Sequence, residues 1–156
     1  MIYVSMGTSG SFPRLLKRMD ELAAETDLEI VVQTGHTPQT AKHCRMIQFV
    51  SSQKDYFQQA DLIISHAGLG TQLELLQMHR PFLVVPRRLE YQEHTDNHQV
   101  ETCEILHKKY GILYFLETKD ITASILKNPP PSYSFSNENL ENFRRNILPV
   151  LFGEKI

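Results

Sequence analysis

The residues with the clearest chemistry lie in ISHAGLGTQLELL, residues 64–76, where an apolar run meets a glycine-rich corner. His66, Gly68 and Thr71 stand in this corner, and Glu74 follows about one helical turn later. The first turn of a helix carries unpaired N–H groups and the positive end of the helix dipole, so such a corner attracts phosphate. A nearby carboxylate accepts hydrogen bonds from both hydroxyls of a ribose. The pattern therefore indicates binding of a nucleotide diphosphate.

A corner of the same kind, GTSGS at residues 7–11, comes earlier in the chain and is called the first corner, and the corner at residues 66–71 is called the second. Neither corner completes a nucleotide-loop motif. The first lacks the terminal lysine of a Walker loop, and the second has Leu73 where a dinucleotide fingerprint needs its third glycine. Gln33 and Thr34 also stand where an NAD-binding protein needs an acidic residue. Each corner alone is explained as well by a tight turn, and Glu74 alone is explained better by the helix dipole.

The elements that position these corners alternate along the chain. Leu69, Leu73 and Leu76 are expected to form the buried stripe of the helix that carries Glu74. Apolar runs that alternate with helices predict an α/β, Rossmann-like parallel sheet with helices on both faces. The expected strands are residues 2–5, 28–33, 45–50, 62–65, 82–85 and 112–116, and the expected helices are 12–24, 53–59, 70–78, 96–109 and 137–148.

Length, charge and cysteine content limit the classes of protein to which the chain can belong. The 156 residues fit one domain, and the formal net charge of -2 gives no basic footprint for nucleic acid. Cys44 and Cys103 are too few for a disulfide framework or a four-cysteine zinc site, so we expect reduced thiols. The sequence has neither a signal peptide nor an apolar run long enough to span a membrane, which predicts a cytoplasmic protein.

Several spaced motifs together resemble one family. Residues 61–74 read D-x-x-I-S-H-A-G-x-x-T-x-x-E, Pro81 and Pro86 bracket the next expected strand, and DNHQ follows at 96–99. This combination resembles the donor-binding C-terminal domain of GT-B glycosyltransferases, including the lipid II-forming N-acetylglucosaminyltransferases. It is most similar to the soluble subunit of the two-subunit UDP-GlcNAc transferase of dolichol-linked glycan synthesis and to that subunit's bacterial capsule and exopolysaccharide relatives. The resemblance covers nearly the whole chain, residues 1–156.

The resemblance implies a role for particular residues. It gives a ribose contact at Glu74, diphosphate contacts at His66, Gly68 and Thr71, a cleft loop at Gly7, Thr8, Ser9 and Gly10, and sugar contacts at Asn97 and Gln99. His66 is also the candidate catalytic residue, with the alternative that a partner supplies the general base. The chain departs from many relatives at Thr102, where they carry asparagine.

The function that follows from the resemblance is transfer of a hexose-type sugar from a UDP-sugar to a lipid-diphosphate-linked acceptor in glycan or polysaccharide assembly. UDP-sugar is the co-substrate, and no cofactor or metal is expected. Because the chain matches a single donor-binding half, we expect a heterodimer in which a membrane-anchored subunit supplies the acceptor site. That partner would recruit the chain to the inner face of the membrane, with the helix at 137–148 as the docking element.

Other interpretations of the same residues stay open. The alternative function is that of a non-catalytic nucleotide-sugar-binding enhancer or scaffold of a partner transferase, since no self-contained acid/base pair is visible. His94 and His98 flank Asp96 in a pattern that resembles a metal site, but Thr95 stands where the zinc motif needs glutamate. Arg87 and Arg88 are expected to be a solvated pair.

Overall fold

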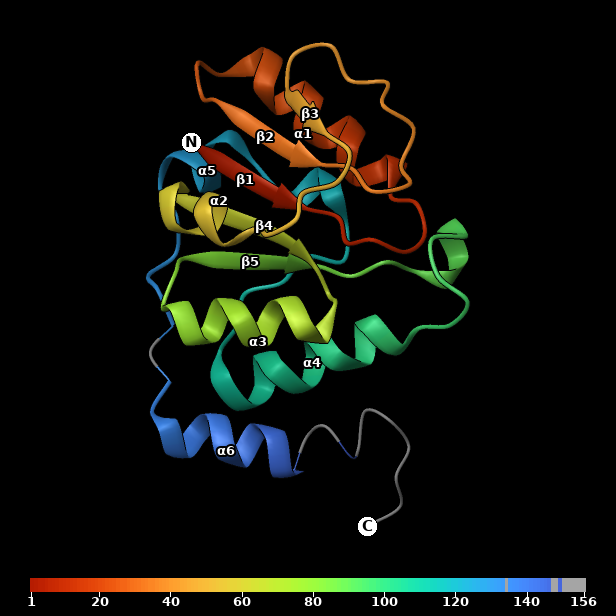
Figure 1. Cartoon of the computed structure of the whole chain (residues 1–156). Coiled ribbons are helices and arrows are strands. Elements are labelled where there is room, and N and C mark those ends of the chain that lie inside the picture. Colours follow the sequence, from red (N-terminus) through yellow and green to blue (C-terminus); the bar gives the residue numbers. More distant parts are fainter. Residues whose placement is uncertain (134, 147–148, 150–156) are drawn as a thin grey trace.

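The computed structural model describes residues 1–133, 135–146 and 149, and its centre is one parallel sheet (Figure 1). The strand order is β3-β2-β1-β4-β5, so β1 lies between β2 and β4. Strands β1, β2, β4 and β5 are buried along their whole length, because their apolar and β-branched side chains are covered on both faces. The strands are β1 (Ile2–Ser5), β2 (Ile30–Gln33), β3 (Arg45–Ile47), β4 (Leu62–His66) and β5 (Phe82–Val85).

Helices cover both faces of this sheet, which confirms the predicted Rossmann-like α/β class. On one face, α1 and α5 pack their apolar side chains on one hydrophobic cluster with Ile2, Val4 and Ile64. On the other face, α2, α3, α4 and α6 share a cluster with Tyr3 and Ile63. The helices are α1 (Pro13–Glu25), α2 (Lys54–Gln59), α3 (Leu69–Met78), α4 (His98–Tyr110), α5 (Ala123–Lys127) and α6 (Asn137–Asn146), with 3-10 turns η1 (Leu89–Tyr91) and η2 (Thr118–Asp120).

The prediction of a sixth strand at residues 112–116 is wrong. Tyr114 makes an isolated parallel bridge to Val84, held by hydrogen bonds from Val84 N to Leu113 O (3.0 Å) and from Phe115 N to Val84 O (2.9 Å). The segment therefore follows β5 over one residue pair and then leaves it. Ile112 is buried and residues 113–116 are half-buried, and the segment does not complete a strand.

The buried stripe expected for α3 is confirmed at Leu76 and wrong at Leu69 and Leu73. The buried side chains are Gln72, Leu75 and Leu76, whereas Leu69 and Leu73 are half-buried at the edge of the same cluster. Helix α4 lies beside α3, and the two helices share a small pocket near their first turns. The apolar residues of α3 are thus divided between the sheet and neighbouring elements, so one stripe does not describe them.

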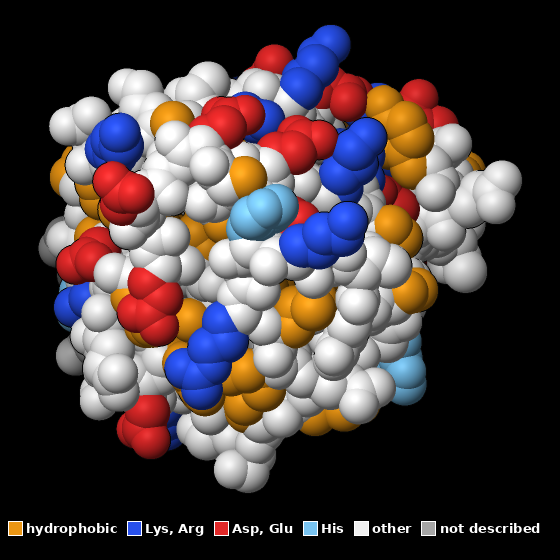
Figure 2. All heavy atoms as spheres, turned by 90° about the horizontal axis from the view of Figure 1, so that it is seen from above, with side chains coloured by type: hydrophobic (Ala, Val, Ile, Leu, Met, Phe, Trp, Pro, Cys, Tyr) orange, Lys and Arg blue, Asp and Glu red, His pale blue; other side chains and the backbone are white. Residues whose placement is uncertain are grey.

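The C-terminal helix α6 packs on the chain itself. Leu140 and Phe143, two members of its apolar stripe, lie in the cluster that also contains α3 and α4. Residues 147 and 148, the end of the expected docking helix, lie outside the described residues, and its docking role stays a prediction. Within the described part of the chain, no helix is long and apolar enough to cross a membrane. Figure 2 shows basic and acidic side chains interspersed on the face seen from above.

Candidate functional site

The two glycine corners lie next to each other at the carboxyl edge of the sheet. Strands β1 and β4 are direct neighbours, with Ser5 opposite Ser65, and a corner follows each of them. In parallel sheets this edge is where ligands bind. The structure therefore brings the segments 7–10 and 66–71 together, although almost sixty residues separate them in the sequence.

His66 fills the space between the two corners. Its ring is 9% exposed, and Nδ1 lies 3.2 Å from the carbonyl oxygen of Ser5. A Cβ added to Gly7 would lie 2.6 Å from His66 Nε2, and one added to Gly68 would lie 2.7 Å from Cε1 and closer still to Nε2. Side chains do not approach this closely, so both glycines are needed for the corners to close on the imidazole. Gly7 also has a φ of +79°, which favours glycine by itself.

The environment of His66 keeps its ring neutral at neutral pH. Burial and, to a lesser extent, the charges of Arg87 and His94 lower its pKa to about 4, although the hydrogen bond to Ser5 opposes these effects. A neutral, enclosed imidazole is well suited to holding the two corners in position. The catalytic role that the resemblance implied for His66 stays a prediction, and this geometry favours a positioning role.

Helix α3 opens at the second corner. Its first internal hydrogen bond runs from Gln72 N to Gly68 O (3.1 Å), so the N–H groups of residues 69–71 precede the helical ladder and face outward from it. Thr71 and Glu74 are both half-buried on this helix. Among the described residues, neither a cation nor a hydrogen-bond donor pairs with the Glu74 carboxylate. That carboxylate retains its capacity to accept hydrogen bonds from a ligand.

Arg87 holds the first corner by hydrogen bonds to its backbone. The prediction that Arg87 belongs to a solvated pair is therefore wrong. Its side chain is 2% exposed, and its guanidinium donates hydrogen bonds to the carbonyl oxygens of Met6 and Ser9. Burial lowers the pKa of this guanidinium, and the nearby Glu93 carboxylate opposes that effect. The sequence did not predict the burial of Arg87, because a charged side chain on a loop is normally exposed. Its position just after a buried strand was the available signal.

A second ionic network fixes the loop between β5 and α4. The Glu93 carboxylate, 6% exposed, accepts from Arg14 Nε and from a terminal Arg14 nitrogen, both at 2.9 Å, and from Arg88 N at 3.1 Å. Arg88 in turn pairs with Glu90 and Glu117. This loop is thereby tied to α1 and to the segment before η2. Sequence patterns did not single out Arg14 or Glu93.

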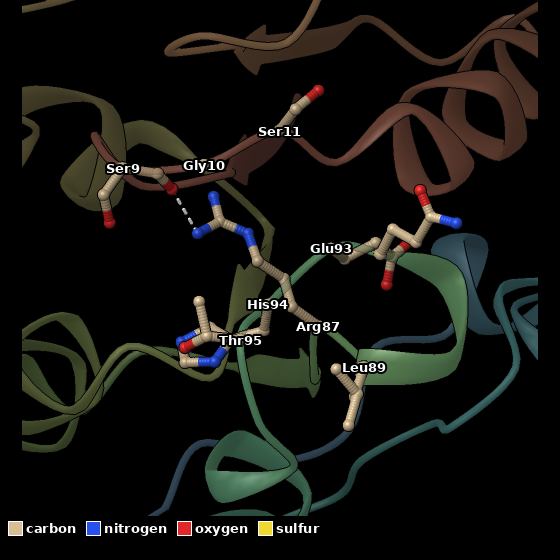
Figure 3. Close-up of a pocket in the computed structure, with 9 residues that line it drawn as sticks. Ser9, Gly10, Ser11, Arg87, Leu89, Glu93, His94 and Thr95 are labelled. Carbon is tan, nitrogen blue, oxygen red and sulfur yellow. Dashed lines mark hydrogen bonds between the residues drawn. The ribbon is translucent and has the colours of Figure 1, made fainter.

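Two adjoining pockets lie along this loop. The larger, about 470 Å³, lies between Ser9–Ser11 and residues 87–95. Figure 3 shows Arg87 reaching across it to Ser9, with Glu93 on one side and His94 and Thr95 on the other. The smaller, about 140 Å³, is formed by Ala67 and Leu69 with residues from His94 to Thr102. Neither Thr71 nor Glu74 is among the residues that line these two pockets.

The two amides predicted to contact a sugar both help to hold the loop. Asn97 Oδ1 accepts from Leu89 N at 3.2 Å, and Gln99 Oε1 accepts from Arg87 N at 2.9 Å. Their NH₂ groups are left to donate toward a ligand. Thr102, the position that departs from many relatives, is buried and donates to His98 O within α4. Within the described residues no group of three or more His, Cys, Asp or Glu is arranged to hold a metal ion.

Known proteins are similar to this chain in sequence and in fold. The family model described as "Glycosyltransferase family 28 C-terminal domain" matches residues 1–142. The chain belongs to this family.

Two curated relatives illustrate the match. The chain is 32% identical over 142 residues to the UDP-N-acetylglucosamine transferase subunit ALG13 of Mus musculus, which covers 83% of this chain and 11% of the mouse protein. It is 28% identical over 148 residues to the UDP-N-acetylglucosamine--N-acetylmuramyl-(pentapeptide) pyrophosphoryl-undecaprenol N-acetylglucosamine transferase of Trichodesmium erythraeum (strain IMS101), which covers 90% of this chain and 38% of that enzyme. The chain thus spans only part of the length of either relative.

Solved structures agree with the fold. An NMR structure of ALG13 superposes with a TM-score of 0.62 at 16% identity, covering 97% of this chain and 96% of that one. A crystal structure of MurG from Acinetobacter baumannii gives a TM-score of 0.55 at 17% identity, covering 80% of this chain and 38% of that one. Both neighbours have the Rossmann-like arrangement seen here, and the similarity to GT-B glycosyltransferase domains is confirmed.

The contact between His66 and the second corner predicts that alanine substitutions at Gly68 and Gly70, both at the start of α3, differ in their effect on stability. Gly68→Ala forces Cβ into the His66 ring although its φ of -71° suits alanine, so we expect the free energy of unfolding to fall by about 1–3 kcal/mol. Gly70 has no atom within 4 Å of an added Cβ, so Gly70→Ala should change stability by less than about 1 kcal/mol and favour the helix. Urea denaturation of both variants measures this. Equal stability of the two would contradict the packing described here.

Proposed function

We propose that this chain is the donor-binding part of a two-component glycosyltransferase that moves a hexose-type sugar from a UDP-sugar to a lipid-diphosphate-linked acceptor. The observation that carries the proposal is the pair of glycine corners closed over His66, at the edge where α3 begins. There the N–H groups of residues 69–71 precede the helical ladder of α3 and are left to donate to a diphosphate. The names of the mouse and bacterial relatives, both UDP-N-acetylglucosamine transferases, support a UDP-sugar as donor.

The proposed reaction uses each part of the edge differently. The diphosphate lies against the N–H groups of residues 68–71, whose dipoles stabilise the charge that grows as UDP departs. The carboxylate of Glu74 accepts hydrogen bonds from the ribose hydroxyls. The NH₂ groups of Asn97 and Gln99 donate to the sugar, and the fixed loop that carries them keeps these donors in place.

The acceptor and the partner are part of the same proposal. The bacterial relative is named for an acceptor linked to pyrophosphoryl-undecaprenol, and the mouse relative is named as a transferase subunit. These names support a lipid-diphosphate-linked acceptor and a membrane-anchored partner chain that presents it at the inner face of the membrane. Capsule or exopolysaccharide assembly is the pathway we propose for such a pair.

The ribose contact is testable with ligands that lack its hydroxyls. Wild-type protein should bind UDP more tightly than 2′,3′-dideoxy-UDP, because the Glu74 carboxylate accepts from both hydroxyls. Glu74→Gln should weaken UDP binding by about tenfold and leave the dideoxy ligand nearly unaffected, since hydrogen bonds to a charged group contribute about 1.5–3 kcal/mol. Isothermal titration calorimetry measures both affinities, with Glu104→Gln on the exposed face of α4 as the matched control. Unchanged UDP affinity in Glu74→Gln would rule out the ribose assignment.

Reconstitution distinguishes a catalytic subunit from a non-catalytic enhancer or scaffold. We expect sugar transfer from radiolabelled UDP-sugar only when this chain is combined with the proposed acceptor-site partner chain. The pair reconstituted with Glu74→Gln should lose most of its transfer rate when the UDP-sugar concentration is below the KM of the wild-type pair. If the partner alone transfers sugar at the full rate, the enhancer interpretation is correct and the proposed function is wrong.

A further inference from the structure

His94 is the residue that joins the two pockets of the site. It contributes to the 470 Å³ pocket beside Ser9 and Gly10 and to the 140 Å³ pocket beside Ala67 and Leu69. These neighbours belong to the first and the second glycine corner, so the imidazole lies where a ligand that touches both corners must pass. About 30% of the His94 side chain is exposed, so a ligand can reach it.

Asp96 holds the His94 ring in one orientation. Nδ1 of His94 lies 3.0 Å from Asp96 Oδ1, closer than the 3.4 Å to the Asp96 amide, so we assign the Nδ1 proton to the bond with the carboxylate. Asp96 Oδ1 is itself fixed by the backbone N–H of His98 at 2.9 Å. That hydrogen bond holds the pKa of the Asp96 carboxyl below its usual range, together with the charges of His94 and His98. With Nδ1 bonded to the carboxylate, Nε2 is the ring nitrogen left for a ligand, and in the imidazolium form it carries a proton to donate.

The three arginines at this edge of the sheet are already bonded to other groups of the protein. Arg87 donates to the backbone of the first corner, and Arg14 is paired with Glu93. Arg88 is paired with Glu90 and Glu117. His94 differs from all three because its carboxylate partner occupies one nitrogen and its second nitrogen is not part of the scaffold. In its imidazolium form His94 has a spare donor at Nε2, and a departing diphosphate requires such a donor.

We propose that His94, oriented by Asp96, contacts the sugar-bearing phosphate of the donor and is a catalytic residue of the transfer. This rests on the proposed function. The loop carries His94 just ahead of Asn97 and Gln99, which are assigned to the sugar, so the phosphate beside His94 is the one bonded to that sugar. As the acceptor oxygen bonds to the anomeric carbon, the bond from that carbon to the phosphate oxygen breaks and its electron pair stays on the diphosphate. The acceptor's proton passes to water, and the His94 Nε2–H donates a hydrogen bond to the departing phosphate without being consumed.

The test compares three ligands that differ in their phosphates. Calorimetric affinities for UDP, UMP and uridine are measured on full-length wild type, His94→Gln and His94→Lys. In His94→Gln we expect UDP affinity to fall by about tenfold while UMP and uridine bind as before, since one charge-assisted hydrogen bond to the distal phosphate is lost. In His94→Lys most of the preference for UDP over UMP should be retained, because the positive charge is kept. His79→Asn, at the far end of α3, is the matched control.

The outcomes separate this inference from the proposed function. An unchanged ratio of UDP to UMP affinity in His94→Gln overturns the phosphate contact while UDP binding by the wild type still supports the proposed function. An equal loss for all three ligands also overturns it, because that is the result of a structural role. If the wild type binds neither UDP nor uridine, the proposed function fails and the inference fails with it.

Discussion

The closure of two glycine corners over one buried histidine is the contact on which the rest of the site depends. His66 can lie between them only because Gly7 and Gly68 have no side chain, and its ring hydrogen-bonds the end of β1 from the end of β4. This fixes the spacing of two loops that the parallel sheet already places side by side. Since the enclosed ring is neutral, it adds no charge that would compete with a bound anion's partners. Positioning and charge are thus separated: His66 sets the geometry, and other groups supply the positive potential.

Ionic contacts then extend this rigid edge to the loop before α4. Arg87 holds the first corner from below, and Glu93 ties the loop to Arg14 on α1. Buried charges are costly unless they are paired or hydrogen-bonded. The Arg87 guanidinium donates to two backbone carbonyls, and Arg14 pairs with the Glu93 carboxylate and also donates to backbone carbonyls. The free NH₂ groups of Asn97 and Gln99 and the second nitrogen of His94 consequently lie on a fixed support. Preorganised donors of this kind stabilise developing charge without reorganising during the reaction.

Much of this arrangement was predictable from the sequence, and the rest depends on distant partners. Continuous apolar runs predicted the sheet, and the paired corners followed from glycines directly after two of those runs. The burial of Arg87 was not predictable from its neighbours, since the carbonyls it satisfies lie 78 and 81 residues earlier in the chain. Glu93 was missed for the same reason, with Arg14 79 residues away. The run 112–116 has strand-like residues, yet it meets β5 at one position only, because pairing is decided by the path of the chain. The roles of Glu74, Asn97 and Gln99 come from family resemblance, and the structure adds their hydrogen-bonding capacity.

The central claim is that a uridine diphosphate lies against the two corners. Titration of ¹⁵N-labelled protein with UDP, followed by two-dimensional NMR, tests it directly. We predict saturable shifts that are largest for the amides of residues 7–10 and 68–71. A larger cavity of about 540 Å³ lies between α1 and residues 40–42. Shifts centred there, or the absence of any saturable shift, would contradict the account.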